Sequence, residues 1–163
     1  SDITQVFLTN FHPLRRRGLA AFEDARWHVS ELEREAVGAQ LVEKYQEAER
    51  AGDGDLAAAV RAEVGLLQRC KAAPDRLADG VDLFPLYGVT PGSAGLLLPL
   101  PAYTVLVAGD AVATIEALER GKVISPVFNL EQAQESFREA VEIADVIVCG
   151  RDNAVLNPLR RSM

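Results

Sequence analysis

Residues 88–112 read GVTPGSAGLLLPLPAYTVLVAGDAV and carry the strongest pattern in the chain. Two short apolar runs, at residues 95–100 and 103–108, are bounded by Gly, Pro and Asp, which is typical of buried strands, and a proline-containing turn separates them. A Thr-Pro-Gly-Ser turn precedes the first run, and Gly-Asp-Ala follows the second. We therefore predict a loop, two adjacent strands and a second polar loop, in which Asp110 directly follows a buried strand.

The rest of the chain alternates between predicted strands and predicted helices, which is typical of a mixed α/β domain. Strands are expected at residues 3–9, 25–30, 80–87 and 145–149, and helices near 19–23, at 31–50, from a cap at Asp55 to about 73, at 112–120 and at 130–144. Ser30 followed by Glu33 is a capping box that starts the first long helix. A Gly-Asp-Gly turn joins the two long helices, so residues 31–73 are expected to form a helical hairpin inserted into a single domain of residues 1–163.

The composition is that of one globular domain, with 163 residues of which 48% are hydrophobic and 25% charged. No apolar run reaches the ~18 residues of a membrane span, and no signal peptide is visible. Without such a span, no membrane partner is expected. The formal net charge of −7 repels phosphate backbones, so nucleic acid is not an expected partner either. Two cysteines are too few for a disulfide framework, so a cytoplasmic location is expected, with Cys149 a buried core thiol.

Four polar loops come directly after predicted strands, which is where open α/β sheets place their ligand and catalytic sites. They read TNFHPLR at residues 9–15, GVTPGS at 88–93, GDA at 109–111 and GRDN at 150–153. We therefore expect the functional residues of this protein to lie in these loops.

The order and spacing of the four loops resemble the metallo-β-lactamase superfamily of hydrolases, whose motifs are T-H-x-H-x-D-H, G-H-T-P-G-S, G-D-A and a late G-H. Residues 6–33, 88–112 and 131–152 match this pattern in frame, and the resemblance covers nearly the whole chain outside the helical hairpin. It implies an αββα sandwich. Because members have several strands before the first motif, it also implies that N-terminal strands are lacking here, so a missing N-terminal segment or self-association is expected to cover the exposed sheet.

In this superfamily the motif residues bind one or two zinc ions around the water that attacks the substrate. The seven matching positions here hold Asn10, His12, Leu14, Arg15, Val89, Asp110 and Arg151, where the family has His, His, Asp, His, His, Asp and His. His12 and Asp110 alone keep the family's residue, whereas a catalytic zinc ion usually needs about three protein side chains. The resemblance therefore predicts that the zinc site has been lost.

Two arginines at these positions make metal binding still less favourable. An arginine keeps its positive charge in a protein, and at ~4 Å two unit charges interact by about 4 kcal/mol at an effective dielectric near 20. The sign of this interaction toward a metal cation is repulsive. Because a buried carboxylate needs a partner, we predict that Arg15 or Arg151, or both, pair with Asp110 in place of the metal.

The function predicted from the sequence is that of a non-catalytic protein with the metallo-β-lactamase fold and no cofactor. Its role would be structural or the binding of a small anionic ligand. The expected cleft is lined by Asn10, His12, Arg15, Val89, Thr90, Asp110 and Arg151. One alternative is a metal-dependent hydrolase of esters, thioesters or phosphoesters, in which His12 and Asp110 hold one zinc, iron or manganese ion. Another is an interaction protein that docks a partner through the helical hairpin.

Several polar residues have structural interpretations as well. A histidine in a loop, such as His12, is more often hydrogen-bonded than catalytic, and Ser93 belongs to a turn without a readable His–carboxylate pair. His28 lies on a strand and is expected to be half-buried. The three arginines at residues 15–17 are expected to be solvated or internally paired, with binding of an anionic ligand as the alternative.

Overall fold

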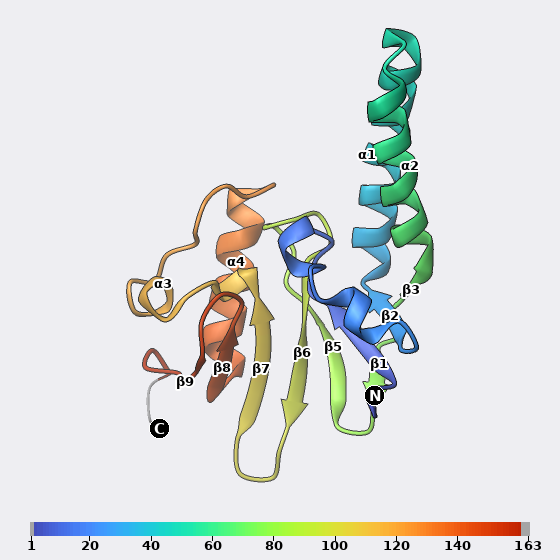
Figure 1. Ribbon diagram of the computed structural model, residues 1–163. Helices are drawn as coiled ribbons and strands as arrows, with labels where there is room; N and C mark the ends of the chain where they lie inside the picture. Colours follow the sequence, from blue (N-terminus) through green and yellow to red (C-terminus); the bar gives the residue numbers. More distant parts are fainter. Residues whose placement is uncertain (1, 161–163) are drawn as a thin grey trace. The chain divides into compact units, whose positions relative to one another are not determined.

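The computed structural model describes residues 2–160, and the chain forms two compact units that meet in sequence between Ala72 and Ala73. Figure 1 labels most helices and strands of the two units, which we call unit 1 and unit 2 in chain order. The prediction of one domain across the whole chain stays a prediction. Among the described residues, no helix is both long and apolar enough to cross a membrane.

Unit 1 contains a parallel three-stranded sheet in the order β1-β2-β3. Its strands are β1 (Gln5–Leu8), β2 (Arg26–Val29) and β3 (Cys70–Ala72), and the short 3-10 helices η1 (Pro13–Arg15) and η2 (Leu19–Phe22) connect the first two. The first two strands and the helical turn near residue 20 were predicted. The third strand was not, because its residues extend the periodic pattern of the preceding helix.

The predicted helical hairpin follows β2 and consists of α1 (Glu31–Ala51) and α2 (Gly54–Arg69). Ser30 caps α1, since its side chain accepts a hydrogen bond of 3.2 Å from the Glu33 amide, as the capping box predicted. The predicted cap of α2 was wrong: Asp53, and not Asp55, accepts from the Leu56 amide at 2.9 Å. The helix also ends at Arg69 rather than near residue 73, because the chain turns into β3.

The hairpin packs against the sheet of unit 1 through a single hydrophobic cluster. Alternation along β2 directs Trp27 and Val29 into it, and both are almost fully buried. The other buried members are Leu8, Phe11, Leu19, Ala25, Leu41, Val60, Leu67 and Cys70. Ala48 and Ala57 are 1% exposed, so small side chains are buried on both helices of the hairpin.

Unit 2 is built on a six-stranded sheet in the order β4-β5-β6-β7-β8-β9. The strands are β4 (Arg76–Ala78), β5 (Val81–Pro85), β6 (Ala94–Pro99), β7 (Thr104–Gly109), β8 (Val146–Cys149) and β9 (Ala154–Leu156). All pairs are antiparallel except β7 with β8. The four central strands were predicted. The edge strands β4 and β9 were not, because three residues are too few to show alternation.

The parallel pair β7–β8 requires a crossover, and the helices of unit 2 supply it. The helix predicted at residues 112–120 is interrupted, with a 3-10 turn η3 (Asp110–Val112) followed by α3 (Ile115–Glu119). The predicted cap Asn129 is confirmed and starts α4 (Leu130–Ile143), whose apolar face covers one side of the sheet. Buried residues of this core include Leu86, Leu106, Leu118, Phe137, Ala140 and Ile147.

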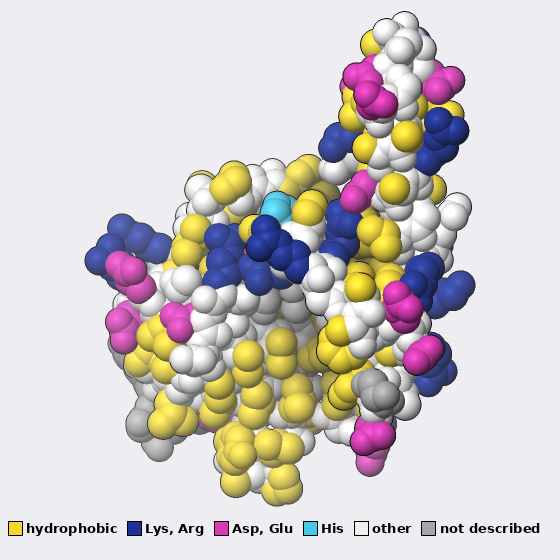
Figure 2. Space-filling model, in the orientation of Figure 1, with side chains coloured by type: hydrophobic (Ala, Val, Ile, Leu, Met, Phe, Trp, Pro, Cys, Tyr) yellow, Lys and Arg dark blue, Asp and Glu magenta, His cyan; other side chains and the backbone are white. Residues whose placement is uncertain are grey.

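Hydrophobic side chains also gather over β6 and β7 and the turn between them (Figure 2). Leu100 and Tyr103, in that turn, are 42% and 47% exposed. That a preceding segment or a second copy covers an exposed sheet stays a prediction.

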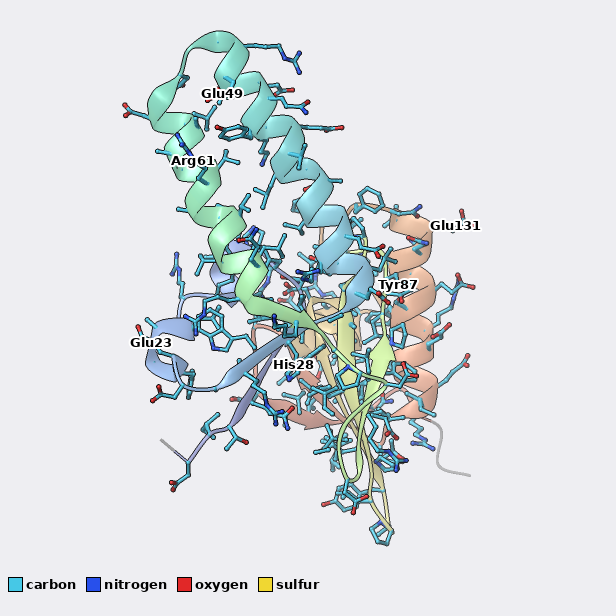
Figure 3. The ribbon with its side chains drawn as sticks, turned by 90° about the vertical axis from the view of Figure 1, so that its right-hand side faces the viewer. Glu23, His28, Glu49, Arg61, Tyr87 and Glu131 are labelled. Atoms are coloured by element: carbon cyan, nitrogen blue, oxygen red, sulfur yellow. The ribbon has the colours of Figure 1, made fainter. Side chains whose placement is uncertain are left out.

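His28 differs from its prediction, because it is buried rather than half-buried, with 9% exposure (Figure 3). Neither ring nitrogen has a hydrogen-bond partner among the described residues. It alternates with Trp27 and Val29 along β2, and its register partners are Phe7 on β1 and Lys71 on β3. Burial lowers the pKa of His28, and the positive charge of Arg26 lowers it further.

This lowered pKa predicts a stability that falls on acidification. The folded protein resists protonation of His28, so below the ordinary pKa near 6.5 the unfolded chain binds more protons than the folded one. The contribution of neutral His28 to the free energy of unfolding is therefore complete above that pH. It is lost as the pH falls toward the lower pKa of the folded state. We expect His28→Phe to reduce the slope of unfolding free energy against pH, by up to about 1.4 kcal/mol per pH unit for one proton. Urea unfolding between about pH 8 and 5 measures it, and a slope unchanged in the variant would contradict this account.

Candidate functional site

The loop after β1 is held by side chains that accept backbone hydrogen bonds. Asn10 is 1% exposed, and its Oδ1 accepts from the His12 amide at 3.0 Å. The Nδ1 of His12 accepts from the Leu14 amide at 3.2 Å and so caps η1. A nitrogen that accepts carries no proton, so neutral His12 bears its proton on Nε2. Neither nitrogen then offers a lone pair to a metal ion without loss of this cap.

A buried carboxylate supports the same loop from α1. Glu33 is 1% exposed, and its Oε1 accepts from the Phe11 amide at 3.1 Å. The sequence analysis assigned Glu33 only to the capping box, since nothing in the sequence ties it to a residue 22 positions earlier. Its carboxylate accepts a hydrogen bond from the backbone of the loop, so Glu33 is a positioning residue for the loop.

The loop at residues 88–93 docks on the start of α4. Gly88 has φ +125°, and a Cβ there would lie 2.2 Å from the Ala133 nitrogen, so only glycine fits. Backbone bonds from Phe128 and Asn129 to the carbonyls of Val89 and Gly88 complete the contact. Val89 offers no ligand atom in its side chain, and Val89 and Thr90 are both half-buried.

Ser93 is structural, as its turn predicted. Its hydroxyl donates to the Leu86 carbonyl at 2.6 Å in a buried position. This hydroxyl thus donates to a backbone carbonyl and not to a base that could activate it. The thiols are equally unsuited, because burial raises the pKa of both Cys70 and Cys149, and Cys149 is a core residue as predicted.

Asp110 and Arg151 form the charged centre of unit 2. Asp110 follows β7 in η3, and its side chain is 6% exposed. Arg151 follows β8, and its Nε donates to the Asp110 Oδ1 at 3.0 Å. The Arg151 side chain remains 49% exposed, so the cation reaches from solvent to a buried carboxylate. This is the pairing with Arg151 that the sequence analysis predicted.

Two glycines bring these residues together. Gly109 has φ 55° and ψ −145°, a conformation that residues with side chains rarely adopt. A Cβ on Gly150 would lie 2.5 Å from the carbonyl carbon and oxygen of Gly109, so the ends of β7 and β8 touch through backbone alone. The amides of Gly150 and Arg151 then donate to Val112 and Ala113 at 3.1 and 2.8 Å, which fixes the loop after β8 against η3.

The donor atoms at the seven family positions do not suit a metal ion. Asn10 and His12 use their acceptor atoms on backbone amides, and Asp110 already faces a guanidinium. Within residues 2–160, no three His, Cys, Asp or Glu side chains form a group that could hold a metal. The structure brings Asn10 together with His12 in unit 1, and Asp110 with Arg151 in unit 2. A common cleft that also includes Arg15, Val89 and Thr90 stays a prediction.

No protein-family model and no curated protein matches this chain, but solved structures do. AidC, a dizinc quorum-quenching lactonase solved with the product N-hexnoyl-L-homoserine, has a TM-score of 0.68 and 16% identity over 95% of this chain. AbOPH, a hydrolase of the β-lactamase superfamily, has a TM-score of 0.65 and 17% identity over 98% of this chain. AiiA of B. thuringiensis, solved with N-decanoyl-L-homoserine at its active site, has a TM-score of 0.61 and 22% identity over 93% of this chain.

These likenesses establish the fold. It is the fold of metallo-β-lactamase superfamily members, as the four loops predicted. The chain spans 60% of the length of AidC, 65% of AbOPH and 56% of AiiA.

The Asp110–Arg151 pair predicts a loss of stability on substitution. We expect Asp110→Ala to lower the free energy of unfolding by about 2 kcal/mol, because it removes a buried charge-assisted hydrogen bond. Asp82→Ala is the matched control, since Asp82 accepts from the Nε of Arg76 at 3.2 Å in an exposed position, and its loss is expected to cost less than about 1 kcal/mol. Urea unfolding measures both, and equal effects would contradict the assigned role of Asp110.

Proposed function

We propose that this chain is a non-catalytic protein with the metallo-β-lactamase fold, in which an ion pair has replaced the metal charge at the site. The observation that supports it is the 3.0 Å contact between Arg151 Nε and Asp110 Oδ1. If Asp110 bound a metal ion, it would lose its hydrogen bond to the Arg151 guanidinium, and the positive charge of Arg151 would repel the metal. The Asp110–Arg151 pair thus acts against a zinc hydroxide mechanism.

The proposed role is structural, with small anions as the ligand class. Arg151 donates to Asp110 through Nε, and its half-exposed side chain has further N–H groups available to a carboxylate or phosphate. Structurally, the pair joins the loop after β7 to the loop after β8. Both roles, anion binding and the joining of the two loops, use the Arg151 guanidinium and the Asp110 carboxylate, and neither role requires a metal.

A metal-dependent hydrolase is the second candidate. What favours it is the description of AidC as a dizinc lactonase and of AbOPH as a hydrolase, together with His12 and Asp110 at two of the seven family positions. It would require His12 to give up the cap of Leu14 and Asp110 to turn from Arg151. The donor atoms present do not fit such a metal, and we assign no catalytic step to one.

Metal content distinguishes the two candidates. Protein purified without chelator and supplied with zinc, iron and manganese is expected to hold close to no metal per chain by elemental analysis. About one ion per chain, lost in His12→Ala and Asp110→Ala but kept in Asp82→Ala, would reinstate the hydrolase.

A further inference from the structure

A pocket of about 300 Å³ lies entirely within unit 1. It is formed by the segment containing η1 and η2, by β2 and by the end of α2. The residues that give it its chemistry are Arg16, Arg17, Leu19, Trp27, Leu66 and Arg69, and we call it the arginine pocket. None of them belongs to the cleft predicted from the four loops. Its volume is at the lower end of the range for small-molecule sites, roughly 300–1,000 Å³.

Arg16 provides a fixed wall of the pocket. Its side chain is 7% exposed, its Nε donates to the Phe11 carbonyl at 2.9 Å, and both terminal nitrogens pair with the Glu63 carboxylate. The guanidinium also lies over the Phe11 ring, 4.3 Å from its centroid. Its position is therefore set before any ligand arrives. This confirms internal pairing for one member of the arginine run.

Arg69 and Arg17 supply the donors that remain. The Cζ of Arg69 lies 3.7 Å from the centroid of the Trp27 ring. One terminal nitrogen of Arg69 donates to the carbonyl of Glu23, which is labelled in Figure 3. Arg17 is exposed and makes no hydrogen bond or ion pair within residues 2–160. Glu23 contributes the one carboxylate among the lining residues, against three guanidinium groups. Because Glu63 neutralises Arg16, the charges of Arg17 and Arg69 remain against that of Glu23, and the pocket is positive although the chain carries a net charge of −7.

The remaining wall is apolar and rigid. Leu19 and Trp27 are 5% and 3% exposed, and Leu66 is half-buried. The Trp27 indole is held by a hydrogen bond of 2.8 Å from Nε1 to the Phe22 carbonyl. A ligand in this pocket meets unused N–H groups of arginine on one side and aliphatic surface on the other.

We propose that the arginine pocket binds a small amphipathic anion, with a carboxylate or phosphate head group on a short apolar chain. The planar fork of arginine matches the oxygens of either head group, and Arg17 can move onto it because it has no hydrogen bond or ion pair to another described residue. The apolar chain would lie against Leu19 and Leu66. The site is independent of Asp110 and Arg151, so the proposed function and this proposal can fail separately.

Trp27 makes the test direct, because it is the single tryptophan of the chain and lines the pocket. Octanoate and octyl phosphate, titrated into the full chain, are expected to change its fluorescence with saturation at about millimolar concentration or below. Isothermal titration calorimetry gives the affinity. Octanamide, which has the same chain without the charge, and inorganic phosphate, which has the charge without the chain, are each expected to bind at least roughly tenfold more weakly.

Arg17→Gln is expected to keep the fold, since Arg17 is exposed and makes no ion pair with the residues that the structure describes. It is expected to weaken binding of the preferred anion roughly tenfold. Arg50→Gln, in the exposed last turn of α1, is the matched control and is expected to bind like the original chain. No saturable binding, equal binding of octanamide or of inorganic phosphate, or an unchanged affinity in Arg17→Gln would each overturn the proposal.

Discussion

At the ends of β7 and β8 the two backbones lie so close that no side chain fits between them. A Cβ on Gly150 would lie 2.5 Å from the Gly109 carbonyl, and the next residue of each strand end then faces the other as Asp110 and Arg151. The two strands pair in parallel, and α4 lies on the crossover between them. Beside this close approach Asp110 is buried, and the half-exposed side chain of Arg151 reaches it from solvent.

The ion pair balances the charge of the buried Asp110 carboxylate within unit 2. A guanidinium supplies a permanent positive charge that depends neither on metal supply nor on the protonation of histidine. In unit 1, the corresponding loop is likewise built from internal bonds, with Asn10, His12 and Glu33 all accepting from backbone amides. Both loops therefore direct their polar atoms to the protein's own structure.

The sequence predicted the fold and the four loops because these depend on local patterns and on motif order. It also predicted that Arg15 or Arg151, or both, pair with Asp110, since a buried carboxylate needs a partner, and the structure shows the pair with Arg151. It did not predict Glu33 beneath the first loop or the burial of His28, because both depend on contacts between distant segments. The arginine pocket was missed for the same reason: Arg17 and Arg69 lie on different elements, and only packing brings them to one cavity.

The central claim is that Asp110 and Arg151 stabilise each other without a metal. A double-mutant cycle of Asp110→Ala and Arg151→Ala, followed by urea unfolding with chelator and again with excess zinc, tests it most directly. The account predicts a coupling free energy of about 1 kcal/mol or more, the same in both conditions. A coupling near zero, or an original chain that zinc stabilises through Asp110, would contradict it.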